Sequence, residues 1–184
     1  MKLPEIKKAP CVHPYPETTM FGAIAASAKR VPQAPALDFM GKITTYCEFV
    51  RKIELTAGAF IKFGIRKNDV VTICMPNTPQ GVICLYALNR IGAVANILHP
   101  LSAQEEIRDH INRVKSKVLL CVNICSEKIA NIIDKTSLKC VIVASPGNSM
   151  PKIMKALYAL KCIKNFKYDK KLPVVDGTEA LGLC

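Results

Sequence analysis

The chain has 184 residues, half of them hydrophobic, and 26 basic against 14 acidic side chains give a formal net charge of +12. This length suits one domain, and this composition excludes an intrinsically disordered chain. No apolar run reaches the roughly 20 residues that a membrane-spanning helix needs, and the N-terminal lysines precede no apolar signal region. We therefore expect a soluble, cytoplasmic protein without a transmembrane segment.

The N-terminal part of the chain predicts an arm, a short helix and a hairpin. Residues 1–20 are rich in proline and lysine and predict an extended arm. The alanine-rich segment 21–30 predicts a helix that ends before Pro32, because the residue before a proline disfavours helical backbone. The segments 36–39 and 42–44 flank a Met-Gly pair, which favours a tight hairpin.

A regular alternation of helix and strand begins at Thr45. Thr45 and Glu48 have the spacing of a capping box and predict a helix that runs to Phe63 and stops at Gly64. Later helices are also expected to begin at side-chain caps, since Ser and Thr accept hydrogen bonds from the first free N–H groups of a helix. These further N-caps are Thr78 before Pro79, Ser102 in a second capping box with Glu105, and Ser126.

The predicted strands are apolar throughout and do not alternate in polarity. They cover residues 70–75, 93–98, 118–122 and 139–144, and the helices after them cover 79–91, 102–113, 126–135 and 150–163. Continuous apolar strands separated by helices are typical of a parallel sheet with right-handed crossovers. We therefore predict an α/β domain over residues 21–171, a parallel sheet with helices on both faces, followed by an irregular tail over 172–184.

The positive charge is spread along the chain, with one concentration between Lys152 and Lys171. Seven lysines lie in this segment, with only Asp169 to oppose them. Such a face could meet an anionic partner, but a lysine-rich solvated face is the favoured interpretation. A nucleic-acid function would depend on net charge alone, because no glycine- and aromatic-rich signature accompanies the lysines. We expect no nucleic-acid partner.

Nine cysteines raise the question of a metal or disulfide framework. Five of them sit inside apolar runs, where cysteine acts as a small hydrophobic residue. These are Cys74, Cys84, Cys121, Cys140 and Cys162. The one close pair, Cys121 and Cys125, has neither a second pair nor a histidine nearby to complete four ligands. We predict buried free thiols, with no zinc site and no disulfides.

Ligands of open parallel sheets bind beyond the carboxyl ends of the strands, so the loops there are the first place to look for chemistry. The loop 76–79 has no glycine and does not predict a pyrophosphate cradle. His99 and Ser102 lie close enough in sequence to suggest a hydrolase pair. However, the chain has no G-x-S-x-G elbow, and Ser102 already has a predicted capping role.

Two other polar groupings give no site. Glu106 and His110 are one helical turn apart beside Asp109, a spacing that suits two metal ligands but is more typical of a solvated helix face. His13 has no evident partner in the arm, and the segment 176–179 predicts a turn. The sequence therefore assigns no catalytic residue, no cofactor-binding residue and no metal ligand.

Several segments together resemble a known family. Residues 69–82 read DVVTICMPNTPQGV, and residues 87–102 read ALNRIGAVANILHPLS. Before them come PQAPAL at 32–37, TYCEF at 45–49 and GIRKNDVV at 64–71. In this order they resemble the N-terminal part of the AMP-forming adenylating enzymes, such as acyl-CoA synthetases and acid–thiol ligases of the coumarate ligase type. The resemblance covers about residues 21–144, and it depends on the order of the segments.

The resemblance implies the N-terminal subdomain of the acyl-CoA synthetase-like fold and a reaction in two steps. In the family a carboxylate attacks the α-phosphate of ATP, and a thiol, usually coenzyme A, then takes the acyl group. The family motifs for this are a Ser/Thr/Gly-rich phosphate loop, an aromatic-Gly-x-Thr-Glu segment, a ribose-binding Asp and a C-terminal Lys. None of these motifs is present in this chain. Asp176–Glu179 is only superficially similar to the aromatic-Gly-x-Thr-Glu segment, since it lacks the aromatic residue and the spacing. ATP, Mg²⁺ and coenzyme A are therefore implied for the full-length family and not for this chain alone.

Two functions remain open at this point. The first is an N-terminal fragment of an AMP-forming carboxylic acid–CoA ligase, inactive alone, truncated within 172–184 and partnered by the missing C-terminal portion. Such a fragment would expose apolar surface and tend to self-associate. The second is a non-catalytic interaction module that uses the Lys152–Lys171 face for an acidic partner. The coding sequence downstream of Cys184 would discriminate between them.

Overall fold

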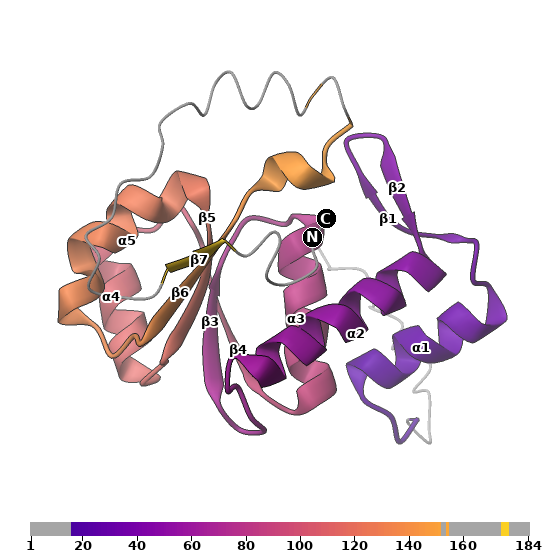
Figure 1. Ribbon diagram of the computed structural model, residues 1–184, viewed down its shortest axis with the longest axis horizontal. Helices are drawn as coiled ribbons and strands as arrows, with labels where there is room; N and C mark the ends of the chain where they lie inside the picture. The colour runs from indigo at the N-terminus through magenta and orange to yellow at the C-terminus, as the bar shows by residue number, and fades with distance from the viewer. Residues whose placement is uncertain (1–15, 152–153, 155–173, 177–184) are drawn as a thin grey trace, which may run out of the picture.

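The computed structural model describes residues 16–151, 154 and 174–176 (Figure 1). The N-terminal half contains α1 (Met20–Arg30), β1 (Pro35–Phe39), β2 (Lys42–Thr45), α2 (Tyr46–Lys62), β3 (Val70–Cys74) and α3 (Pro79–Ile91). It is followed by β4 (Val94–Leu98), α4 (Gln104–Arg113), β5 (Val118–Val122), η1 (Asn123–Cys125), α5 (Ser126–Ile132) and η2 (Ile133–Lys135). The last elements are β6 (Cys140–Ala144), η3 (Pro146–Ser149) and β7 (Val174–Asp176).

The central sheet has five strands in the order β4-β3-β5-β6-β7, and every neighbouring pair is parallel. The four predicted strands and their parallel arrangement are therefore confirmed. The fifth strand, β7, was not expected: Val174 to Asp176 pair with Val141 to Val143 inside the segment 172–184 that was predicted to be irregular. A three-residue strand is too short to show a recognisable pattern in sequence.

Helices cover both faces of this sheet. Figure 1 shows α2 and α3 on one face with α1 beside them, and α4 and α5 on the other. The rings of Phe49 on α2 and Tyr86 on α3 meet edge to face, with centroids 5.5 Å apart. On α1, the backbone N–H of Phe21 donates to Asn89 Oδ1 at 3.0 Å, and the Arg90 guanidinium lies 5.0 Å from the Phe21 ring centroid. The predicted helical layers are confirmed.

The hairpin and the first caps form as predicted. Met40 and Gly41 both have positive φ, as a two-residue hairpin turn requires. Thr45 and Glu48 form both hydrogen bonds of a capping box, Thr78 accepts from the backbone N–H of Gly81, and Gly92 ends α3 in the left-handed conformation.

Two predicted caps are wrong. The N-cap of α4 is Ala103, which has no side chain able to cap, and the backbone carbonyl of Ser102 instead accepts a hydrogen bond from Lys128 Nζ. Ser126 is the first residue of α5, and its hydroxyl donates back to the carbonyl of Asn123. Each of these helices therefore begins one residue away from the predicted position.

Three predictions fall wholly or mostly on residues outside those that the structure describes. They are the arm over 1–20, described only from residue 16, the helix over 150–163 and the lysine-rich segment Lys152–Lys171. Within the described residues, no helix has the length and apolar character needed to cross a membrane.

Candidate functional site

The strand order places a topological switch point at the carboxyl ends of β3 and β5. These neighbouring strands lead into helices on opposite faces, since α3 follows β3 on one face and α5 follows β5 on the other (Figure 1). The two connections diverge from the sheet at this point. Ligands of doubly wound sheets bind in the crevice that such a divergence creates. We therefore take the carboxyl ends of β3 and β5, with the loops that follow them, as the candidate site.

Three cysteines meet at the switch point. Cys74 ends β3 and is the register partner of Cys121 on β5, while Cys125 ends the η1 turn that follows β5. All three are buried free thiols. The neighbouring Cys125, together with burial, raises the pKa of the Cys74 thiol. Cys74 and the Lys128 ammonium lower the pKa of Cys125.

The loop after β4 closes over this cluster. The Cys125 thiol donates to the carbonyl of Pro100 at 3.6 Å, and Lys128 Nζ on α5 donates to the carbonyl of Ser102 at 3.0 Å. Beside them, His99 Nδ1 accepts from the backbone N–H of Leu101 at 3.2 Å. This loop therefore ties the ends of β4 and β5 together through backbone carbonyls.

Gln80 supplies the one buried polar side-chain atom of the described residues that has no hydrogen-bond partner. Its side chain is 2% exposed in the first turn of α3, and Nε2 donates to the carbonyl of Ser145 after β6 at 3.2 Å. Its Oε1 accepts nothing within the described part of the chain. A buried acceptor left unpaired typically costs about 1–3 kcal/mol, so this atom marks a place where a donor would be favourable.

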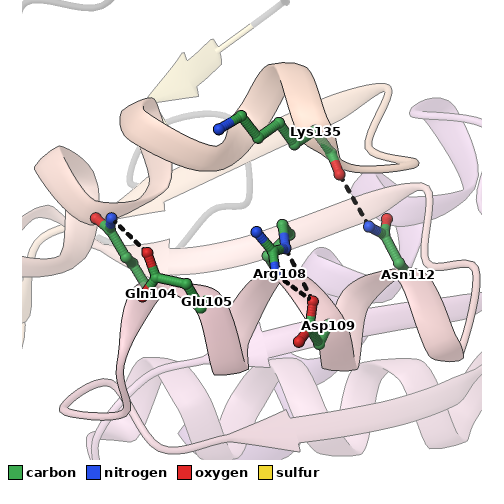
Figure 2. Close-up of polar contacts among 6 residues, drawn as sticks. All are labelled: Gln104, Glu105, Arg108, Asp109, Asn112 and Lys135. Atoms are coloured by element: carbon green, nitrogen blue, oxygen red, sulfur yellow. Dashed lines mark hydrogen bonds and ion pairs between the residues drawn. The ribbon is translucent and has the colours of Figure 1, made fainter.

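The residues suspected from the sequence do not assemble into a catalytic or metal site. His99 is used by the neighbouring N–H of Leu101. His110 Nε2 and Glu106 Oε1 are 4.0 Å apart on an open helix face. Asp109 forms an ion pair with Arg108 instead, and its Oδ1 accepts a hydrogen bond from Arg108 Nε at 2.8 Å (Figure 2). Within the residues that the structure describes, no three His, Cys, Asp or Glu side chains are arranged to hold a metal ion.

Nor do the described residues at this edge fit a nucleotide phosphate. Binding a phosphate at a helix N-terminus needs free backbone N–H groups. In the loop between β3 and α3, Pro76 and Pro79 have no N–H, and the Thr78 hydroxyl is engaged by the N–H of Gly81. The two prolines therefore reduce the number of N–H groups that this loop could offer to a phosphate.

A hollow of about 470 Å³ opens at the opposite edge of the sheet, where β3, β5 and β6 begin. Asp69, Lys117 and Lys139 line it together with apolar residues. The Asp69 carboxylate accepts from the backbone N–H of Arg66 at 2.7 Å and so serves the turn before β3. Because it lies at the amino ends of the strands, this hollow is a weaker candidate than the switch point.

Comparison with known proteins decides the family. The family model described as AMP-binding enzyme matches residues 24–168. The chain belongs to the AMP-binding enzyme family. It is 26% identical over 154 residues to a long-chain-fatty-acid–CoA ligase of Escherichia coli O157:H7, an alignment that covers 80% of this chain and 27% of that enzyme.

Further relatives of this AMP-binding family member agree. The mitochondrial acyl-CoA synthetase short-chain family member 3 of Homo sapiens is 37% identical over 76 residues, covering 41% of this chain and 11% of that protein. The crystal structure of coronafacic acid ligase from Pectobacterium brasiliense superposes with a TM-score of 0.72 and 17% identity, over 90% of this chain and 29% of that one. The chain thus spans less than a third of the length of these proteins.

Sequence reasoning missed the thiol cluster and Gln80. It placed Cys74 and Cys121 in separate apolar runs, and it assigned no role to Gln80. The signal that unites them is strand order, since β3 and β5 become neighbours only after β4 is placed outside them.

Proposed function

We propose that this chain supplies the N-terminal α/β subdomain of an AMP-forming carboxylic acid–CoA ligase and does not activate an acid alone. The observation that carries this proposal is the family match over residues 24–168 in a chain that covers only 27% of the E. coli ligase. The chain's own sequence also lacks the glycine-rich phosphate loop on which the proposed chemistry depends. On this proposal the described residues are a scaffold, and the reacting groups lie in additional polypeptide.

The proposed reaction of the complete ligase explains why the scaffold alone would not catalyse adenylation. A carboxylate oxygen attacks the α-phosphorus of ATP and expels pyrophosphate, and the sulfur of coenzyme A then attacks the acyl carbon and expels AMP. The first step concentrates negative charge on phosphate oxygens, and loss of one stabilising donor typically costs about 10²–10³ in rate. The edge at Pro76 and Pro79 offers no such set of donors. ATP, Mg²⁺ and coenzyme A therefore belong to the complete enzyme in this proposal.

Pyrophosphate release tests the proposal. The purified chain is incubated with ATP, Mg²⁺ and short-chain, long-chain and aromatic carboxylic acids, with and without coenzyme A. A full-length long-chain-fatty-acid–CoA ligase is the positive control, and the reaction without protein sets the background. We expect no acid-dependent release above background. Release well above it would overturn the scaffold role.

The coding sequence after Cys184 separates this proposal from the interaction-module alternative. A Ser/Thr/Gly-rich loop followed by an aromatic-Gly-x-Thr-Glu segment would support the ligase scaffold. Absence of both in every frame, together with a silent pyrophosphate assay, would favour an interaction module. That alternative depends on the charge of Lys152–Lys171, which lies outside the described residues apart from Met154. A cytoplasmic location remains a prediction under either function.

A further inference from the structure

Charge is divided unevenly between the two edges of the central sheet. The connections from β3 to α3, from β4 to α4 and from β5 to α5 contain no Lys, Arg, Asp or Glu. The connections from α2 to β3, from α4 to β5 and from η2 to β6 contain five basic side chains and one acidic side chain, that of Asp69. The basic side chains are all exposed, and they are Arg66, Lys67, Lys115, Lys117 and Lys139. Because the strands are parallel, three segments far apart in sequence bring this charge to the edge where β3, β5 and β6 begin.

The hollow of about 470 Å³ lies on this basic edge, at the other end of the strands from the switch point. Its lining combines Lys117, Lys139 and one carboxylate with an apolar wall that includes Phe63, Ile65 and Val118. Small-molecule sites typically have about 300–1,000 Å³, an apolar lining and a few polar groups. We propose that this hollow binds a small amphipathic monoanion, a carboxylate with an apolar tail. The carboxylate lies between the two lysines and the tail packs on the apolar wall, a role independent of the proposed ligase function.

Lys117 and Lys139 are neighbours across the sheet. The backbone N–H groups of Lys139 and Cys140 donate to the carbonyl of Lys117 at 2.7 and 3.2 Å, and in the next row Val118 is the register partner of Cys140. Neighbouring strands lie about 4.8 Å apart, and like charges opposite each other in a sheet are destabilising. Within the part of the chain that the structure describes, neither ammonium group forms an ion pair with a carboxylate. An anion between the two lysines relieves their repulsion.

Side-chain hydrogen bonds fix the two loops that carry these lysines. Asn112 Oδ1 accepts from the backbone N–H of Ser137 at 3.0 Å. Asn112 Nδ2 donates to the carbonyl of Lys135 at 2.8 Å (Figure 2). The Ser137 hydroxyl in turn donates to the carbonyl of Ser116 at 2.9 Å. A site whose walls are held in place before the ligand arrives loses less conformational entropy on binding.

The charge of the lining favours a monoanion over a polyanion. Lys117 and Lys139 contribute two positive charges and Asp69 one negative charge, so the lining carries a net charge of one. The nearby Arg66 adds no free donor, because its guanidinium donates to the carbonyl of Ile61 at the end of α2, at 2.7 Å. One carboxylate therefore balances the lining, and the apolar wall selects an anion with a tail over a small hydrated ion.

The test is a titration of the full chain with octanoate, followed in ¹H–¹⁵N correlation spectra. Acetate, which lacks the apolar tail, and octanol, which lacks the charge, are the control ligands. We expect octanoate to cause saturable shifts of the amide signals of Gly64, Val118 and Cys140, which line the hollow. The controls should shift them much less at equal concentration. The amide signals of Gly81 and Leu101, at the carboxyl ends of the strands, should stay unchanged, which separates this site from the switch point.

Charge-removing variants test the role of the lysines. Lys117→Gln and Lys139→Gln should each weaken octanoate binding about threefold, the size typical of an exposed ion pair, and the double variant about tenfold. Lys115→Gln is the matched control, since Lys115 is exposed beside Lys117 but does not line the hollow, and it should bind like the wild type.

The wild-type titration decides the proposal even where a variant fails to fold. Absence of saturable shifts around the hollow, shifts centred on Gly81 and Leu101, or an equal response to acetate or octanol would overturn it. Unchanged octanoate affinity in a folded Lys117→Gln/Lys139→Gln variant would overturn it as well.

Discussion

The side-chain oxygen of Ser116 accepts a hydrogen bond from the backbone N–H of Thr72 at 3.1 Å, across 44 residues of sequence. Ser116 lies in the loop before β5, is fully buried, and also approaches the carbonyls of Val70 and Val118 at 3.2 and 2.9 Å. The Ser116 side chain thus continues the hydrogen bonding between β3 and β5 on the N-terminal side of Val118, the first residue of β5. The junction of the two strands that bound the candidate site thus depends on one hydroxyl.

Ser116→Ala is therefore expected to destabilise the protein by about 1–3 kcal/mol, because it leaves the buried N–H of Thr72 without a partner. Urea unfolding followed by circular dichroism measures the loss. Ser27→Ala is the matched control, since the Ser27 hydroxyl donates to a helical carbonyl on the surface of α1. It should change the free energy of unfolding by less than about 0.5 kcal/mol. Equal effects of the two variants would contradict the structural role of Ser116.

The two capping-box sequences of the chain should respond differently to alanine. Thr45 and Glu48 form both capping hydrogen bonds, at 3.3 and 3.0 Å, so Thr45→Ala should cost about 1 kcal/mol. Ser102 has the same spacing to Glu105, but Ala103 is the N-cap of α4. Ser102→Ala should therefore leave the midpoint of thermal unfolding nearly unchanged. A loss at Ser102 as large as that at Thr45 would show that α4 begins at Ser102.

The difference between these caps shows why sequence alone predicted most of the elements but not all of their ends. Thr45 caps α2 through hydrogen bonds with Glu48, three residues further on, and this spacing is visible in the sequence. At the start of α4 the Ser102 carbonyl instead accepts a hydrogen bond from Lys128 Nζ, which lies 26 residues further on. A contact over such a distance does not follow from local sequence spacing.

Strand identity and strand order differ in the same way. The predicted strands were recognisable because burial on both faces makes them apolar throughout, as in β5, where four of the five residues are buried. The order of the strands depends on the face of the sheet on which each crossover helix packs. The sequence of a helix does not indicate which face this is. The pairing of Cys74 with Cys121 and the approach of Gln80 to Ser145 follow from that order, so sequence reasoning left these residues apart.

Alkaline pH should reveal the burial of Cys84. In an unfolded chain a thiol loses its proton near pH 8.5, about its ordinary value, whereas burial in α3 raises the pKa of Cys84 to about 12. Because the thiolate is then favoured in the unfolded state only, the contribution of Cys84 is complete below about pH 8.5. As the pH rises toward 12, it falls by about 1.4 kcal/mol per pH unit.

The measurement compares Cys84→Ala with wild type in urea at pH 8 and pH 10. Alanine removes the titrating thiol but also leaves a small cavity, so the variant is expected to be less stable at pH 8. The difference in the free energy of unfolding between variant and wild type should shrink by about 2 kcal/mol at pH 10. Only the wild type is destabilised there, because its buried thiol stays protonated while the unfolded chain loses that proton. The same deficit at both pH values would mean that Cys84 titrates alike in the folded and unfolded protein.

Exposed apolar side chains near the candidate site should make the chain self-associate. Leu101 and Ile124 are among the most exposed large hydrophobic residues that the structure describes, and the contact of Cys125 with Pro100 brings their two loops together. Contiguous exposed apolar surface favours association. We expect sedimentation velocity to show a weight-average sedimentation coefficient that rises with protein concentration.

The double variant Leu101→Ser/Ile124→Ser should weaken this association at least about tenfold in Kd, because burial of one Leu or Ile side chain is worth about 1.5 kcal/mol or more. Leu55→Ser is the matched control, since Leu55 is exposed on α2, an element remote in sequence from both loops. It should associate as the wild type does. If the double variant associates like the wild type while Leu55→Ser does not, the contact surface lies on α2 and not at the switch point.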